Sequence, residues 1–327
     1  MASTGDEEIE WQEDNLTVYF NGAVHREPWT PAELTSACPC PSNPHDVASS
    51  DVTLNARHGT SLRLFLPATP PHSRLPILLY FHGGAFLHSS TRLRHQHANL
   101  SLLASHVNAL IVSVDYRLAP EHPFPAAYED CYEALLWLEK QAKLGLSGEP
   151  WVANHADFSR CFLSGDSAGA TIVHYVGMQA VGHGSWQSEQ EERELKHVCL
   201  QGMLLFHPFF TCGREEEPPP AGGRMAKIFK YINVTNDHPL VDPLSPKAPP
   251  LAAAPLPPAC IFVGGDDALK QGAIVYYNGL VQAGKEAKLS IAEGETHVFH
   301  ILKPASPNVI PLLNEAKDFI TQFKDSV

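Results

Sequence analysis

The chain has 327 residues, of which 23 are basic and 36 acidic, so its formal net charge is −13. This length buries a large core, and 28 prolines with 22 glycines are too few for a collagen-like or low-complexity chain. The acidic balance argues against nucleic acid or an anionic membrane as partner, because both bind through an excess of Lys and Arg. No segment approaches the ~18–20 consecutive apolar residues of a membrane span.

The N-terminal residues and the cysteines indicate the compartment. Residues 1–14 are acidic and lack the basic-then-apolar order of a signal peptide. The 7 cysteines are scattered and odd in number, which favours free thiols in a reducing environment. We therefore predict a cytoplasmic protein. Cys38-Pro39-Cys40 and His95-Gln96-His97 lack a partner pair at finger-like spacing, so we expect no metal.

Residues 1–48 are the first unit in chain order, and we predict that they form an N-terminal lid segment. Within them, Thr30-Pro31-Ala32-Glu33 has the pattern of a capping box, which predicts the start of a helix. We assign residues 49–327 to the core. Its first feature is a predicted hairpin, because two alternating runs, 51–55 and 62–66, flank the turn at 57–60.

The rest of the core alternates short apolar runs with helical patterns. The runs suit strands buried on both faces, and they cover residues 75–81, 109–114, 161–163, 203–206, 260–263 and, more weakly, 288–291. Helical spacing recurs over residues 128–142, 170–180, 274–281 and 309–323. This order predicts an α/β fold with a mostly parallel, doubly wound central sheet and helices on both faces.

One proline-rich stretch, about residues 213–258, interrupts the alternation between two core strands. We interpret it as a cap-like excursion over the sheet rather than a domain boundary. Because proline fixes the backbone, stiff loops here and in residues 1–48 are expected to roof a substrate pocket at the carboxyl edge of the strands.

The strongest chemical signal is Gly165-Asp166-Ser167-Ala168-Gly169, which follows an apolar run and precedes a helical one. In that context G-x-S-x-G predicts a nucleophile elbow, a strained strand-to-helix turn that exposes the serine hydroxyl. Serine is a weak nucleophile and needs a base that a third group orients. In this architecture the chain order is Ser, acid, His.

Carboxylates and histidines follow in that order. Asp266 and Asp267 come at the carboxyl end of the run 260–263, and His297 and His300 come after the last predicted strand. Upstream, His82-Gly83-Gly84-Ala85 ends the run 75–81, and glycines let backbone N–H groups approach a developing oxyanion. The N–H of Ala168, the residue after the nucleophile, is the third expected donor.

Taken together, these motifs resemble the plant-type carboxylesterases of the hormone-sensitive-lipase branch of the α/β-hydrolases. The resemblance is carried by residues 80–84, 115–122, 124–130 and 165–169, by Asp267-Ala268-Leu269 and by His297-Val298-Phe299. It implies nucleophile Ser167, acid Asp267 and base His297, with an oxyanion hole of Gly83, Gly84 and Ala168. It also implies that residues 115–122 support the oxyanion loop. The chain departs from the family pattern at Ala85, usually glycine, and at Gln271, usually acidic and expected behind the site.

The resemblance implies a serine esterase for small, mostly apolar carboxylic esters of plant specialised metabolism. By position, Ala85, Phe86, Asp166 and Val298 are expected to line the substrate pocket. Two alternatives stay open: a lyase or cyclase that uses the same base and oxyanion hole, and a ligand-binding protein like the gibberellin receptors, which lack a working triad histidine. No phosphate loop or dinucleotide fingerprint is present, so we expect no cofactor. The oligomeric state is not readable.

Overall fold

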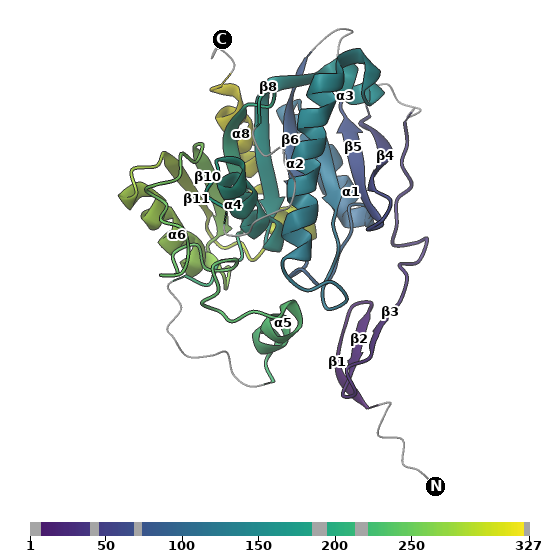
Figure 1. Ribbon diagram of the computed structural model, residues 1–327, viewed down its shortest axis with the longest axis vertical. Helices are drawn as coiled ribbons and strands as arrows, with labels where there is room; N and C mark the ends of the chain where they lie inside the picture. The colour runs from purple at the N-terminus through teal and green to yellow at the C-terminus, as the bar shows by residue number, and fades with distance from the viewer. Residues whose placement is uncertain (1–7, 40–45, 69–73, 185–194, 213–221, 324–327) are drawn as a thin grey trace.

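The computed structural model describes residues 8–39, 46–68, 74–184, 195–212 and 222–323. Its centre is an eight-stranded sheet in the order β11-β10-β9-β8-β6-β7-β5-β4 (Figure 1). The six strands from β11 to β7 run parallel, whereas β5 and β4 are antiparallel at one edge. The bounds are β4 Ala48–Asn55, β5 Thr60–Leu66, β6 Leu75–Phe81, β7 Leu110–Asp115, β8 Ala156–Asp166, β9 Leu200–Phe206, β10 Ala259–Gly264 and β11 Ala287–Ala292.

Helices cover both faces of this sheet, as predicted. One face packs against α2 (Ala126–Leu144), α3 (Pro150–His155), α4 (Ala168–Ala180) and α6 (Lys270–Gln282). The other packs against α1 (Arg94–Val107), α7 (Phe299–Leu302) and α8 (Val309–Thr321). The strands β6, β7 and β10 are buried over nearly their whole length, which explains their continuous apolar sequences. None of the described helices is long and apolar enough to cross a membrane.

The predicted hairpin is confirmed as β4 and β5, but two local predictions differ from the structure. The capping-box hydrogen bond forms, from the Thr30 N–H to Glu33 Oε2 at 2.8 Å, yet only a turn follows. Leu34 instead pairs with Leu93 in an isolated antiparallel bridge, which takes the chain out of helical geometry. Helix α1 was not predicted, because its first turn, Arg94–His97, is polar and the apolar spacing begins only at Leu100.

Residues 8–26 fold into a separate antiparallel sheet of β1 (Ile9–Glu13), β2 (Leu16–Tyr19) and β3 (Val24–Arg26). The excursion at 213–258 contains α5 (Arg224–Ile232) followed by turns, and its residues 213–221 lie outside the described part. Figure 1 shows the small sheet and α5 at the same end of the molecule, the end where the parallel strands terminate in the elbow. Both segments therefore lie beyond the carboxyl edge of the central sheet.

Candidate active site

Three side chains from three strand ends meet at the carboxyl edge of the sheet. His297 Nε2 lies 2.9 Å from Ser167 Oγ, and His297 Nδ1 lies 2.8 Å from Asp267 Oδ2. Ser167 follows β8, Asp267 follows β10 and His297 follows β11. A hydroxyl, an imidazole and a carboxylate in this relay are the parts that activate a serine nucleophile.

The turn that presents Ser167 is strained. Ser167 has φ 52° and ψ −117°, a conformation that L-residues rarely adopt, and it directly precedes α4. Its N–H donates to the Phe206 carbonyl at 2.8 Å, and its own carbonyl accepts from the Phe209 N–H at 3.1 Å. The neighbouring strand β9 therefore holds the elbow in place from one side.

The two glycines of the motif permit the close approach on the other side. A Cβ at Gly169 would lie 1.9 Å from the Phe81 carbonyl oxygen, and one at Gly165 would lie 2.7 Å from the same atom. Any side chain at either position would push α4 away from β6. The sequence spacing G-x-S-x-G is thus a direct consequence of backbone contact between the elbow and β6.

The oxyanion loop after β6 is supported as predicted by the segment that follows β7. The Tyr116 hydroxyl donates to the His82 carbonyl at 2.6 Å, and the Tyr116 ring stacks on the His82 ring at 4.2 Å. The Ala119 N–H donates to the Phe86 carbonyl at 2.9 Å. Gly84 has φ 112°, and a Cβ there would lie 2.2 Å from the His88 carbonyl oxygen, so this position needs glycine.

The structure favours a second set of candidates for the oxyanion donors. The N–H of Gly83 interacts with the Asp166 carboxylate, where it opposes the burial that raises the pKa of that group. Gly84 and Ala85, in contrast, border the cavity that contains Ser167. We therefore propose Gly84 and Ala85 as the loop donors in place of Gly83, with Ala168 as the third. Sequence reasoning passed over Ala85 because it looked for glycines.

Three of the four predicted pocket residues border the cavity, and Phe86 lies behind its wall. Asp166 borders the cavity, but its carboxylate accepts from the Tyr80 hydroxyl at 2.8 Å and is buried. Phe86 is only 1% exposed and packs edge-on against Phe124 and Phe209, so it supports the pocket wall from behind. Ala85 and Val298 do line the cavity. Gln271, expected behind the site, is exposed on α6.

Asp267 has a further partner that the sequence analysis missed. His207 Nδ1 lies 2.8 Å from Asp267 Oδ2, the same oxygen that His297 contacts. The Leu269 N–H donates to Asp267 Oδ1 at 2.8 Å. Burial alone would raise the pKa of Asp267, but the hydrogen bonds from His207 and His297 outweigh it and hold the pKa well below its usual range. The one available signal was that His207 directly follows the predicted strand 203–206, at the same sheet edge.

The structure also distinguishes the neighbouring candidates. His300, three residues after His297, is 3% exposed and lies behind the site with its ring stacked on His207. Asp266 is exposed, whereas Asp267 points to the histidines.

Three potential metal ligands, His207, Asp267 and His297, lie close together. Both imidazole Nδ1 atoms point at one carboxylate oxygen at hydrogen-bond distance, which is the geometry of N–H donors rather than of ligands around a common ion.

A cavity of about 480 Å³ opens directly onto Ser167 and His297. Its walls come from the oxyanion loop, from Phe209, from Arg224 and Met225 of α5, and from the segments that carry Asp267 and Val298. Val298 has φ 45°, a strained conformation for a β-branched residue, at the start of α7. The predicted excursion thus contributes α5 to the wall of the pocket.

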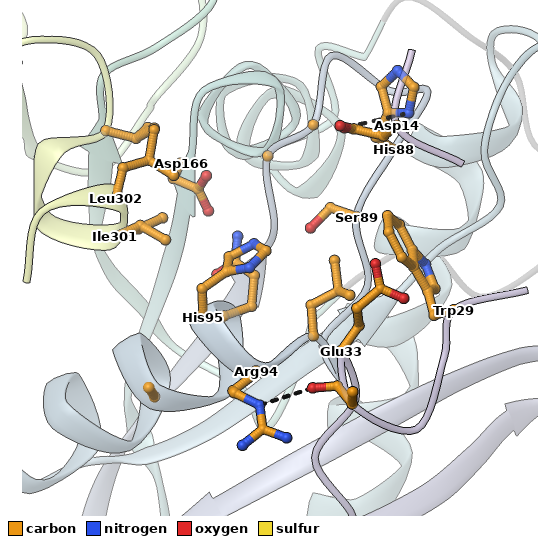
Figure 2. Close-up of a pocket in the computed structure, with 17 residues that line it drawn as sticks. Asp14, Trp29, Glu33, His88, Ser89, Arg94, His95, Asp166, Ile301 and Leu302 are labelled. Atoms are coloured by element: carbon orange, nitrogen blue, oxygen red, sulfur yellow. Dashed lines mark hydrogen bonds and ion pairs between the residues drawn. The ribbon is translucent and has the colours of Figure 1, made fainter. Parts of the chain in front are cut away.

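A second cavity of about 670 Å³ lies on the other side of the oxyanion loop and shares Gly84, Asp166 and Val298 with the first. Figure 2 shows that Trp29 and Glu33 of the N-terminal segment face His95 of α1 and Ile301 of α7 across it. Residues from 1–48 therefore do line the space beside the site.

The small sheet and α5 are held together by side chains on both. Trp11 of β1 stacks on Tyr231 of α5 with 5.2 Å between ring centroids and an interplanar angle of 7°. Glu10 pairs with Lys227 at 2.9 Å and also with Lys230, and Glu13 pairs with Arg224 at 2.7 Å. We call these contacts the clasp. The two segments that border the cavities are thus joined to one another.

The chain is similar to known proteins over most of its length. Residues 78–301 match a family model described as alpha/beta hydrolase fold. Tuliposide A-converting enzyme 1 of Tulipa gesneriana is 36% identical over 88% of this chain and 71% of that protein. 2-Hydroxyisoflavanone dehydratase of Glycyrrhiza echinata is 33% identical over 93% and 94% of the two chains, and probable carboxylesterase 2 of Arabidopsis thaliana is 32% identical over 94% of each.

Solved structures agree with this result. An esterase of Pyrobaculum calidifontis superposes with a TM-score of 0.64 at 27% identity, over 84% of each chain. The match therefore covers most of both molecules rather than one motif.

Proposed function

This chain belongs to the α/β-hydrolase fold family and, within it, to the plant carboxylesterases of the hormone-sensitive-lipase branch, and we propose that it hydrolyses small, mostly apolar esters through an acyl-enzyme on Ser167. The observation that carries the proposal is the relay from Ser167 Oγ to His297 to Asp267, at 2.9 and 2.8 Å, beside a cavity of about 480 Å³. The names of the relatives support a role in plant specialised metabolism. A cytoplasmic location stays a prediction.

In the proposed mechanism, His297 Nε2 accepts the Ser167 proton while Ser167 Oγ attacks the ester carbonyl. Asp267 orients the imidazole and stabilises its cation. The N–H groups of Gly84, Ala85 and Ala168 stabilise the oxyanion, and the loss of one such donor costs roughly 10²–10³-fold in rate. His297 then returns the proton to the leaving alcohol, and it activates the water that releases the acid.

The first test is Ser167→Ala, assayed with p-nitrophenyl butyrate. We expect kcat to fall by at least roughly 10⁴-fold, because the nucleophile is removed while the fold stays the same. Ser164→Ala is the matched control, because Ser164 is buried on the same strand with no hydrogen-bond partner among the described residues. A fluorophosphonate should label the wild type and the Ser164 variant but not the Ser167 variant. Normal turnover by Ser167→Ala would contradict the proposal.

Elimination is the second candidate, and the relative named 2-hydroxyisoflavanone dehydratase favours it. A dehydration needs a base and an oxyanion hole but no covalent serine, so His297 and the Gly84 loop would serve. Product analysis with a β-hydroxy carbonyl compound separates the two reactions. If Ser167→Ala eliminates water at the wild-type rate and neither protein hydrolyses esters, elimination replaces hydrolysis as the function.

Ligand binding without chemistry, as in the gibberellin receptors, is the third reading and has the least support. Its premise is the absence of a working histidine, whereas His297 here lies within hydrogen-bond distance of both Ser167 and Asp267.

A further inference from the structure

His207 occupies an unusual place for a buried histidine. It is the first residue after β9, its side chain is fully buried, and its backbone adopts φ 50° in the left-handed region. Its N–H donates to the Phe262 carbonyl of β10 at 2.7 Å. This strained backbone sends the imidazole toward the next strand end, where Asp267 lies.

The hydrogen-bond inventory fixes the roles of the ring nitrogens. An ionised carboxylate only accepts, so both His207 Nδ1 and His297 Nδ1 donate to Asp267 Oδ2, each at 2.8 Å. Burial lowers the pKa of His207, and the hydrogen bond to Asp267 opposes this effect without cancelling it. The net shift is downward, which favours a neutral ring. A neutral ring that donates from Nδ1 carries no proton on Nε2. That atom is buried and has no hydrogen-bond partner among the described residues.

The groups around His207 agree with a neutral ring. His300 stacks on it at 5.5 Å with an interplanar angle of 14°, and burial holds the pKa of His300 well below its usual range. His297 meets it edge-on at 5.6 Å. The carboxylates of Asp267, Asp166 and Glu295 are the acidic groups that act on it. Phe299 covers a further side with an edge-on ring contact at 5.5 Å.

We propose that His207 is a positioning residue for the reaction. It is a second imidazole donor that fixes the orientation of the Asp267 carboxylate and partly neutralises its negative charge, so that less of this charge acts on His297. Two donors on Oδ2 and one on Oδ1 leave the carboxylate one orientation, the one that meets His297 Nδ1. Because part of the charge of Asp267 is neutralised by His207, Asp267 stabilises the His297 cation less than a carboxylate with a single partner would. This inference rests on the proposed role of the triad.

The test uses two amides that differ only in where they place a donor. The amide nitrogen of Asn takes the position of an imidazole Nδ1, whereas that of Gln takes the position of Nε2. His207→Asn should therefore keep kcat for p-nitrophenyl butyrate within about 3-fold, and Asn tolerates a positive φ. His207→Gln should lower kcat roughly 10- to 100-fold with KM nearly unchanged, because the carboxylate loses its orientation.

The pH profile provides a readout that a merely structural role would not move. Without the second donor the Asp267–His297 pair holds its proton more tightly. We therefore expect the acid limb of kcat/KM to rise by about 0.5–1 pH unit in His207→Gln and to stay in place in His207→Asn. His174→Asn is the control, because His174 is also buried and bonds to the Tyr276 hydroxyl at 3.0 Å, away from Asp267. It should leave the acid limb where it is.

Nitrogen NMR of the wild type, labelled with ¹⁵N-histidine, tests the same point without a variant. His207 should carry its proton on Nδ1 and none on Nε2 at neutral pH, with its signal assigned by its absence from His207→Asn. A proton on Nε2 instead, or a His207→Gln enzyme with wild-type kcat and acid limb, would overturn the proposal. Because the NMR result does not need turnover, it remains decisive even if the protein fails to hydrolyse esters.

Discussion

The site and its roof are built by different physical means. Ser167, Asp267 and His297 follow the ends of buried strands, where close backbone contacts leave no room for a side chain at the elbow glycines. The roof, made of the small N-terminal sheet and α5, is joined instead by the clasp of one aromatic stack and several partly exposed ion pairs. Buried backbone contacts tolerate almost no change, whereas exposed pairs contribute little individually.

This contrast indicates a division of labour. The relay needs fixed geometry, because a displacement of about 1 Å costs about 10²-fold in rate. Arg224 and Met225 of α5 border the cavity at Ser167, so we expect the roof to affect how the proposed substrate enters. Changes at the site should therefore act on folding and kcat, and changes in the clasp should act on KM.

The largest expected effect comes from a methyl group at the elbow. In Gly169→Ala the Cβ would lie 1.9 Å from the Phe81 carbonyl oxygen, and backbone on both sides prevents relief. We expect a loss of more than about 3 kcal/mol of unfolding free energy, or no folded protein. Thermal unfolding measures the loss of stability, and fluorophosphonate labelling measures whether Ser167 still reacts.

Gly22→Ala in the roof is the matched control. Gly22 has φ 83°, but a Cβ there meets nothing within 4 Å, so only the backbone strain of about 1–2 kcal/mol applies. Labelling of Ser167 should be retained. Equal effects of the two substitutions would contradict the contrast between site and roof.

An intermediate effect is expected from Trp11→Ala, which removes the stack on Tyr231. Such aromatic pairs contribute about 0.5–1.5 kcal/mol, so the roof should open more often and KM for p-nitrophenyl butyrate should rise roughly 3- to 10-fold at constant kcat. Phe20→Ala is the control, since Phe20 directly follows β2 and is 61% exposed. If kcat falls while KM holds, the clasp acts on the chemistry rather than on access.

The parts of the site that depend on backbone geometry could be predicted from the sequence. The elbow residues that touch β6 have to be small, so the G-x-S-x-G pattern reports the backbone contact directly. The order of Ser167, Asp267 and His297 along the chain follows the order of the strands that carry them. The central strands were equally readable because strands buried on both faces must be apolar.

The features that could not be predicted from the sequence depend on contacts between segments that are distant along the chain. His207 became relevant only when β9 and β10 lay side by side, and nothing in its local sequence names Asp267 as a partner. The donor that we propose at Ala85 has no signal in the sequence, because an N–H belongs to every residue type except proline. The turn at Thr30 was taken for a helix start because its bridge from Leu34 to Leu93 spans two separate units.

The smallest effect is expected from the ion pairs of the clasp. Hydrogen bonds from Lys230 and Lys227 lower the pKa of Glu10 from an ordinary 4.5 to about 2. A depressed folded-state pKa means that the ionised form favours the docked roof. Its contribution is complete above about pH 4.5 and is lost as the pH falls toward 2. Because such pairs are worth at most about 1 kcal/mol, only a local opening is expected.

Amide exchange of β1, corrected for intrinsic rates, measures that opening. In the wild type, protection of β1 should be lower at pH 3 than at pH 6, whereas Glu10→Gln should show the weaker protection at both, since it carries no charge to lose. Lys247→Gln is the control, because it breaks the exposed pair with Asp237, which involves neither β1 nor α5. A Glu10→Gln protein that still loses β1 protection between pH 6 and 3 would show that another acid holds the roof, with Glu13 and its partner Arg224 as the next pair to test.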